Sequence, residues 1–127
     1  ITIICVSTDI GGYVFGKIIK GPKLTKFSPN KTYSGMIGGF LLSLIFITIF
    51  VNDISAKVDL PINWFVFVIF VSSISQIGDI IISYFKRLSK IKDTGKIIPG
   101  HGGLLDRVDG MIFALPFSYI IFLTDSL

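Results

Sequence analysis

The sequence predicts an all-α membrane protein of about four transmembrane helices, in which basic loops on the cytoplasmic side form the site. Two observations carry this prediction. The mean hydropathy is +0.79 and only 16% of the 127 residues are charged, a composition typical of membrane proteins. In addition, 11 of the 12 Lys and Arg residues fall in two segments, 17–31 and 86–107, that separate apolar stretches. The length allows one domain at most.

Each apolar stretch is a candidate span. Residues 32–52 form 21 residues without a charge, enough to cross a hydrocarbon core of ~30 Å at ~1.5 Å per residue. Residues 60–78 give another 19, which residues 80–85 extend beyond Asp79. The last stretch, 110–124, has 15 residues and needs a turn from each end. The first, 1–16, is apolar except for Asp9, and we expect it to be cut short at its start.

The distribution of basic residues predicts the orientation. By the positive-inside rule, both basic segments lie in the cytoplasm and the loop around Lys57 lies outside. The lone Cys5 stands in an apolar stretch, so we interpret it as a small buried hydrophobe and not as part of a disulfide framework.

The segment 83–109 has the densest chemistry, with six basic residues, three aspartates and the only histidine. Asp79 precedes it near the end of the third span, and Asp106 and Asp109 are expected to return to the same membrane face. Carboxylates with water and phosphate oxygens are the usual ligands of Mg²⁺, and two such ions assist phosphoryl-type displacement. The alternative is that Asp79 merely reaches interface water at a helix end.

The run Pro99-Gly100-His101-Gly102-Gly103 is a candidate anion site, because glycines let backbone N–H groups approach a ligand. Its alternative is an ordinary turn between helices.

The first basic loop offers Ser28, Lys31 and Thr32 as phosphate contacts at the start of a helix. The alternative is that its lysines serve topology or bind anionic lipid headgroups. Asp9, an acid in an apolar span, is a further candidate, with a polar contact between helices as the alternative.

These residues resemble the phosphatidate cytidylyltransferase (CDP-diacylglycerol synthase) family. Its signature reads roughly S-x-x-K-R-x4-K-D-x-G-x-x-x-P-G-H-G-G-x-x-D-R-x-D, and residues 83–109 match it throughout. Two weaker stretches, 9–17 and 28–35, are similar to D-x-x-A-Y-x-x-G-R and S-P-x-K-T-W-E-G. The resemblance implies that residues 1–127 are the C-terminal catalytic portion of an integral membrane cytidylyltransferase whose N-terminal helices are missing.

What the resemblance implies is transfer of cytidylyl from CTP to phosphatidate, which gives CDP-diacylglycerol and pyrophosphate. The expected site lies in a bacterial plasma (inner) membrane and faces the cytoplasm. The expected cofactor is Mg²⁺, as two divalent ions, held by Asp79 and Asp106 with Asp109 and Asp93 as secondary candidates. The implied partners are CTP, phosphatidate and membrane lipids, without nucleic acid; a homodimer is left open. The expected catalytic residues are Asp79, Lys86, Arg87, Lys92, Asp93, His101, Arg107 and Asp109. The expected substrate-binding residues are Ser28, Lys31, Thr32, Ser83, Gly102 and Gly103.

The chain departs from the family pattern at two positions. The family commonly has Glu where this chain has Ser34 and Ile82, and this chain contains no glutamate at all. Each departure removes a carboxylate, which is expected to reduce metal affinity or rate. A non-catalytic membrane fragment is therefore kept as an alternative. A cation channel or transporter using Asp9 and Asp79 is a third interpretation, which the Gly-His-Gly-Gly loop disfavours.

Overall fold

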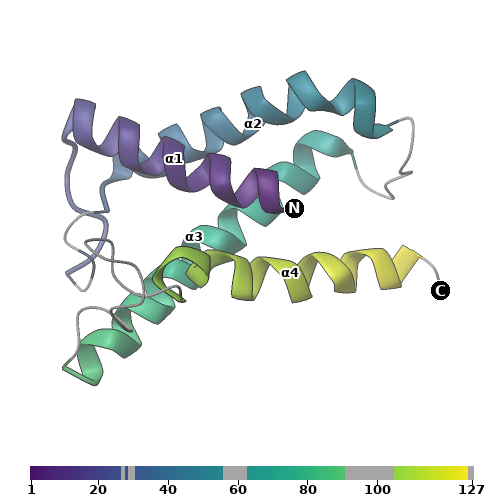
Figure 1. Ribbon diagram of the computed structural model, residues 1–127. Helices are drawn as coiled ribbons and strands as arrows, with labels where there is room; N and C mark the ends of the chain where they lie inside the picture. Colours follow the sequence, from purple (N-terminus) through teal and green to yellow (C-terminus); the bar gives the residue numbers. More distant parts are fainter. Residues whose placement is uncertain (27, 29–30, 56–62, 91–104, 126–127) are drawn as a thin grey trace.

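The computed structural model describes residues 1–26, 28, 31–55, 63–90 and 105–125, with the backbone alone for 51–55, 105–107 and 125. The described residues form four helices (Figure 1): α1 Thr2–Ile19, α2 Tyr33–Ser55, α3 Trp64–Leu88 and α4 Leu105–Asp125. They contain no strand; a single antiparallel bridge joins Lys23 to Thr32 in the loop between α1 and α2. The predicted all-α class is confirmed.

The helices agree with the four apolar stretches, with one difference in the third. Among the described residues, α1, α2 and α3 are long and apolar enough to cross a membrane, whereas the apolar part of α4, Val108–Thr124, is shorter. Helix α3 continues through the basic residues to Leu88, so Lys86 and Arg87 form its last turn. Asp79 consequently lies within α3 and not at its end, because hydrogen bonding continues past the charged residue.

Local side-chain and backbone features set the helix ends. The Asn63 side chain accepts a hydrogen bond from the backbone N–H of Phe65 at 3.0 Å, which caps α3. The Thr32 hydroxyl accepts one from the N–H of Gly35 at 3.1 Å and caps α2 in the same way. Helix α1 ends where Lys20 adopts a left-handed conformation, with φ of 49°.

Helices α1 and α2 run side by side, and α3 crosses obliquely to pack mainly against α4 (Figure 1). Glycines bring the first pair into backbone contact. A Cβ on Gly11 would stand 2.9 Å from the Cα of Gly39, and one on Gly35 would stand 2.6 Å from the carbonyl oxygen of Gly12. Small residues of this kind allow close helix packing within a bilayer, where lipid tails supply little net hydrophobic drive.

The interior of the bundle is small and partly polar. Among the described residues, seven hydrophobic side chains form the core: Ile4, Cys5, Ile47, Phe67, Val68, Val71 and Ala114. Two side-chain hydrogen bonds link the helices nearby: the hydroxyls of Thr8 and Ser72 are 2.7 Å apart, and Gln76 donates to the carbonyl oxygen of Met36 at 3.3 Å. Many large apolar side chains on all four helices are exposed, as expected of a lipid-facing surface.

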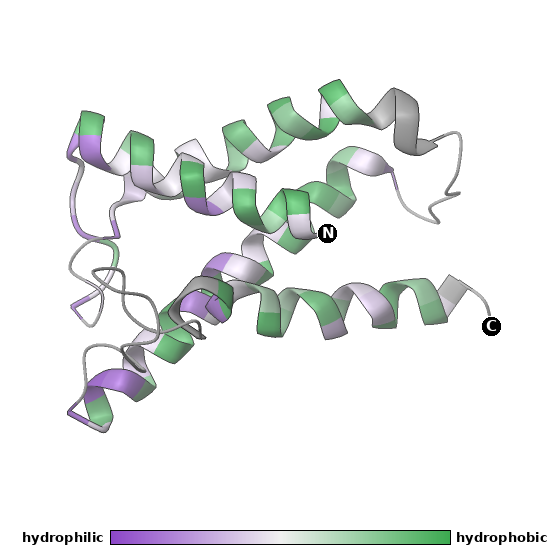
Figure 2. Cartoon of the chain, in the orientation of Figure 1, coloured by the Kyte–Doolittle hydropathy of each residue, from purple (hydrophilic) through white to green (hydrophobic). Residues whose placement is uncertain are grey.

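Hydrophilic residues gather at one end of the bundle (Figure 2), where α1 and α3 end and α2 begins. The described parts of the two basic segments, 17–26, 28 and 31 of the first and 86–90 of the second, therefore share one face, as the alternating path predicts. That this face is cytoplasmic stays a prediction.

Candidate active site

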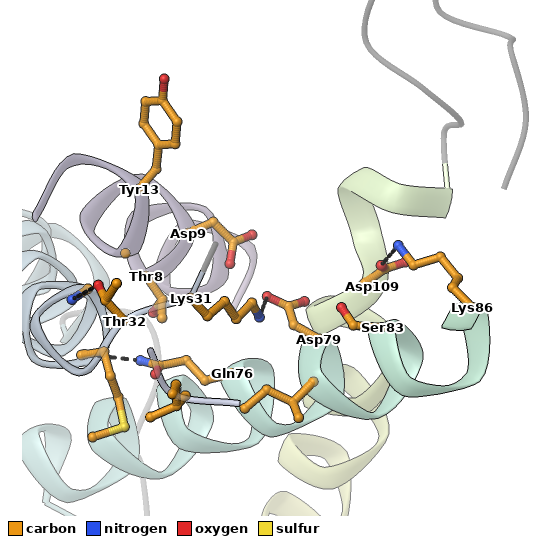
Figure 3. Close-up of a pocket in the computed structure, with 15 residues that line it drawn as sticks. Thr8, Asp9, Tyr13, Lys31, Thr32, Gln76, Asp79, Ser83, Lys86 and Asp109 are labelled. Atoms are coloured by element: carbon orange, nitrogen blue, oxygen red, sulfur yellow. Dashed lines mark hydrogen bonds and ion pairs between the residues drawn. The ribbon is translucent and has the colours of Figure 1, made fainter. Parts of the chain in front are cut away.

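A cavity of about 360 Å³ lies between the α1–α2 pair and the α3–α4 pair, at the end of the bundle that holds the basic residues. Side chains or backbone from all four helices and from the α1–α2 loop line it (Figure 3). The lining residues are Thr8, Asp9, Gly12, Tyr13, Leu24, Lys31, Thr32, Gly35, Met36, Gln76, Asp79, Ile80, Ser83, Lys86 and Asp109. Seven of the residues proposed from sequence are thus brought together: Asp9, Lys31, Thr32, Asp79, Ser83, Lys86 and Asp109.

The first charged contact joins the α1–α2 loop to α3. The Nζ of Lys31 lies 2.8 Å from Oδ2 of Asp79, and the two side chains are 31% and 19% exposed. An acid within an apolar helix is costly without a partner, and Lys31 supplies that partner. The contact connects residues 48 positions apart, so the two basic segments converge on one cavity (Figure 3).

The second charged contact joins α3 to α4. The Nζ of Lys86 lies 3.2 Å from Oδ2 of Asp109, with side-chain exposures of 15% and 8%. Lys86 follows Asp79 by two turns of α3, and Ser83 lies between them on the same face. Both ion pairs therefore border the same row of α3 residues.

Gly110 sets how closely α4 approaches Asp79. A Cβ at this position would stand 2.9 Å from Oδ1 of Asp79 and 2.9 Å from the carbonyl oxygen of Ser75, and it would also collide with the Ser75 hydroxyl. No real Cβ atom tolerates such contacts, so the backbone of α4 itself lies against the Asp79 carboxylate. The other carboxylate oxygen of Asp79, Oδ2, is the one that pairs with Lys31.

Three polar side chains of the lining were not predicted from the sequence: Thr8, Tyr13 and Gln76. A signal for Gln76 exists in the sequence. A set of polar residues recurs at intervals of four and three along α3, which places them on one helix face; they are Ser72, Gln76, Asp79, Ser83 and Lys86. Such a polar stripe in a membrane helix indicates a face turned to other helices or to a cavity.

Groups at the N-terminal end of α2 make hydrogen bonds within the protein. Besides the Thr32 cap, the N–H of Tyr33 donates to Pro22 at 3.1 Å and that of Met36 donates to the Thr32 carbonyl at 3.0 Å. The Ser34 hydroxyl accepts from the N–H of Gly21 at 3.3 Å. The phosphate contact expected here would thus depend on the Lys31 ammonium more than on the amides at this helix end.

The remaining candidate residues do not line the cavity, or their side chains are not among those that the structure describes. Ser28 does not line the cavity; its carbonyl accepts the backbone N–H of Lys31 at 3.1 Å. Arg87 is exposed on α3 and does not line it either. Asp106 and Arg107 stand in the first turn of α4, where only the backbone is described. The expectations that lie wholly outside the described residues are those for Lys92, Asp93, His101, Gly102 and Gly103.

The described side chains include no group of three His, Cys, Asp or Glu placed to hold a metal ion together. Three carboxylates from different helices nevertheless line the one cavity: Asp9, Asp79 and Asp109. Carboxylate oxygens around a polar cavity are the donor type that Mg²⁺ prefers, and Mg²⁺ usually retains several waters in addition. The residues present therefore fit a Mg²⁺ ion in chemistry.

The fold and the cavity define a class: a helical membrane protein with a charged site that opens among apolar helices. Comparison with known proteins makes this specific. A family model described as "Cytidylyltransferase family" matches residues 1–124, and the chain belongs to that family.

Several similar proteins bear the name phosphatidate cytidylyltransferase. The one from Bacillus subtilis (strain 168) is 41% identical over 117 residues, which cover 91% of this chain and 43% of the relative. The one from Brucella suis biovar 1 (strain 1330) is 44% identical over 117 residues, covering 90% and 42%. The resemblance seen in the motifs is confirmed, and the chain spans somewhat less than half the length of these relatives.

Proposed function

We propose that this chain belongs to an enzyme that transfers cytidylyl from CTP to phosphatidate, giving CDP-diacylglycerol and pyrophosphate. The observation that carries the proposal is the Lys31–Asp79 contact, which brings the first basic loop to the face of α3 that also holds Ser83 and Lys86, in one charged cavity among apolar helices. The similar proteins named phosphatidate cytidylyltransferase support the same reaction.

In this reaction, an oxygen of the phosphatidate phosphate attacks the α-phosphorus of CTP. A new P–O bond forms there, and the bond between the α-phosphorus and the bridging oxygen breaks, so that pyrophosphate leaves with the electron pair. No covalent protein nucleophile is needed, because a phosphate monoester is already largely ionised near neutral pH. Catalysis then consists of positioning the reactants and neutralising their charge.

The charged residues of the cavity supply these functions. Lys31 and Lys86 neutralise phosphate groups, and Ser83 between them on the same surface donates a hydrogen bond. Asp79 and Asp106 would hold Mg²⁺, with Asp109, which lines the cavity, as a secondary candidate. When bound, Mg²⁺ supplies positive charge against the oxygens of the triphosphate.

The proposed roles of the other signature residues are carried over from the resemblance. Arg87, Lys92 and Arg107 neutralise phosphates, His101 orients the substrate or carries a proton, and Asp93 is a secondary metal ligand. Ser28 and Thr32 act from the first loop, and Gly102 and Gly103 from the glycine-rich run. A homodimer is a further possibility that the proposal leaves open.

The apolar surroundings suit a lipid substrate. Leu24, Met36 and Ile80 line the cavity beside the charged groups, so that a phosphate headgroup and the start of its acyl chains find matching surfaces. The substrate would enter laterally between helices from the bilayer. We place the site on the cytoplasmic face of a bacterial plasma membrane, where CTP is present.

The missing glutamates bear on the non-catalytic alternative. Neither Ser34 nor Ile82 lines the described cavity. The Ser34 hydroxyl instead bonds the loop through Gly21, and Ile82 is half-buried on α3. The acids that do line the cavity are retained, which favours catalysis over the non-catalytic alternative.

The test of the reaction is pyrophosphate release from CTP by the protein in detergent with phosphatidate and Mg²⁺. Release that depends on all three additions supports the proposal. Substitution of Lys23→Gln, an exposed loop lysine outside the cavity, serves as a control and should leave turnover unchanged. Absence of turnover from a correctly folded preparation would favour the non-catalytic alternative.

The orientation has its own test. In a Cys5→Ser background, a cysteine replaces Lys57 or Lys96, and each is labelled with an impermeant thiol reagent from one side of sealed vesicles. We expect the two positions to react from opposite sides, because the positive-inside rule places only position 96 in the cytoplasm. Labelling of both from the same side contradicts the topology.

A further inference from the structure

The Lys31 ammonium occupies the position beside Asp79 where a metal ion is expected. Its Nζ lies 2.8 Å from Oδ2, while Oδ1 of the same carboxylate lies against the backbone of α4 at Gly110. Oδ2 is therefore the oxygen that Lys31 shares with the cavity. A lysine ammonium and a divalent cation compete for the same lone pairs, so both cannot keep full contact with this oxygen at once.

We propose that Lys31 is an exchangeable counterion of Asp79. A divalent cation that enters the cavity displaces the ammonium from the carboxylate, and Lys31 then presents its charge to an anionic phosphate in the same cavity. The inference deepens the proposed function and rests on it for the identity of the phosphate. It assigns Lys31 two successive partners, whereas the sequence suggests only a phosphate contact.

The surroundings of Lys31 suit such an exchange. Its backbone is held by two hydrogen bonds, from its N–H to the carbonyl of Ser28 at 3.1 Å and from the N–H of Leu24 to its own carbonyl at 2.7 Å. The side chain, by contrast, is a flexible four-carbon stem that is 31% exposed. Because the backbone of Lys31 is held in place while its side chain can change conformation, the ammonium stays within the cavity after it leaves Asp79.

The other ion pair of the cavity does not share these properties. Lys86 and Asp109 both lie on helices, and their side chains are only 15% and 8% exposed. Partly exposed ion pairs contribute little net free energy and exchange readily, whereas a buried charge that loses its partner is strongly penalised. Lys86 is consequently the natural control, since it faces the same cavity from a more buried ion pair.

The exchange gives Lys31 a different role before and after a divalent cation binds. Without a cation, Lys31 neutralises an acid located inside a membrane helix, which protects the fold. With a divalent cation bound, the cavity gains positive charge without losing the lysine, which favours a triphosphate or a lipid phosphate. Cation binding would thus precede tight binding of the anionic substrate.

The experiment measures how fast each lysine of the detergent-solubilised protein reacts with an N-hydroxysuccinimidyl ester, residue by residue by mass spectrometry, with and without Mn²⁺. No nucleotide or lipid substrate is present. We expect Mn²⁺ to accelerate acylation of Lys31 by about fivefold, the factor that corresponds to loss of a partly exposed ion pair. The rate at Lys86 should stay unchanged. In Asp79→Asn, Lys31 should react at the fast rate with or without Mn²⁺.

A second measurement does not require Asp79→Asn to fold. Mn²⁺ affinity is determined from the free-ion electron paramagnetic resonance signal for the wild type, Lys31→Gln and Lys31→Arg. We expect Lys31→Gln to bind Mn²⁺ about fivefold more tightly, because no ammonium competes, and Lys31→Arg to bind at least as weakly as the wild type.

Three results overturn the exchange: no binding of Mn²⁺, binding of Mn²⁺ with an unchanged rate at Lys31, or equal acceleration at Lys31 and Lys86. Turnover of CTP is measured separately on the same preparation. A Lys31 response without turnover supports the exchange and counts against the proposed reaction alone, whereas turnover without a Lys31 response overturns the exchange alone.

Discussion

The bundle consists of two halves, the α1–α2 pair and the α3–α4 pair. The helices within each half pack together through different kinds of contact. Helices α1 and α2 meet through glycines, with backbone against backbone at Gly11 and Gly39. Helices α3 and α4 meet through the Lys86–Asp109 pair and through close approaches at Gly78 and Gly110. The first half therefore positions the loop between α1 and α2, and the second carries most of the charged residues that line the cavity.

The cavity lies where these halves join, and Lys31 is the residue of the first half that reaches the acids of the second. This difference has a practical consequence. Substitutions in the second half should affect both stability and turnover, while those in the first should affect mainly packing or the position of the loop. The following variants test this division.

The largest effect is expected at Asp79, where both halves meet. Asp79→Asn should lower CTP-dependent turnover by roughly 10²–10³-fold, because it removes a charge that a metal or a phosphate-binding lysine requires. Folding should survive, because the amide retains the shape of the side chain. The same loss is expected for Asp106→Asn. Turnover near the wild-type rate at saturating Mg²⁺ in either variant would refute the assignment of that residue.

The buried ion pair of the second half should dominate stability. Lys86→Met removes the ion-pair partner of Asp109, whose side chain is only 8% exposed. We therefore expect the free energy of unfolding to fall by about 3 kcal/mol. The double variant Lys86→Met/Asp109→Asn should recover part of this loss. Denaturant titration in mixed micelles provides the measurement, with Lys31→Met as the matched single variant at the more exposed pair. Equal losses for the two lysine variants would contradict the contrast between the pairs.

Gly110→Ala should be the next most harmful change. The added methyl group meets Ser75 and an oxygen of Asp79 at 2.9 Å, so α4 must move away, at a cost of about 1–3 kcal/mol. Gly12→Ala is the control, since its nearest neighbour would be at an ordinary 3.7 Å. Thermal unfolding compares the two variants, and the idea fails if Gly110→Ala is no less stable than Gly12→Ala.

The smallest effect is expected for the hydrogen bond between α1 and α3. Ser72→Ala removes the partner of the Thr8 hydroxyl at 2.7 Å, yet that hydroxyl also donates within α1 to the carbonyl of Ile4. We expect a loss of about 0.6 kcal/mol, the average for hydrogen bonds between membrane helices. Ser73→Ala is the control, because its hydroxyl bonds only within α3. A loss above that of Lys86→Met would show that this contact between the halves contributes more to stability than the charged pair within the second half.

The sequence alone determined much of this protein. Its apolar stretches and basic segments were enough to predict four helices and a shared polar face, because burying backbone in lipid leaves few alternatives to a helix. The signature residues identified the family, since their number and spacing are specific. The spacing of polar residues from Ser72 to Lys86 also places Gln76 on the same face of α3.

Only the tertiary structure decided which charges are partners. Lys31 pairs with Asp79 and Lys86 with Asp109, contacts that span 48 and 23 positions, and no local pattern specifies such distant pairs. In the structure, Gly110 also lies next to Asp79, and the Thr32 hydroxyl caps α2. These outcomes depend on how closely helices approach and cross, which is set by packing among all of them and not by the periodicity of any one.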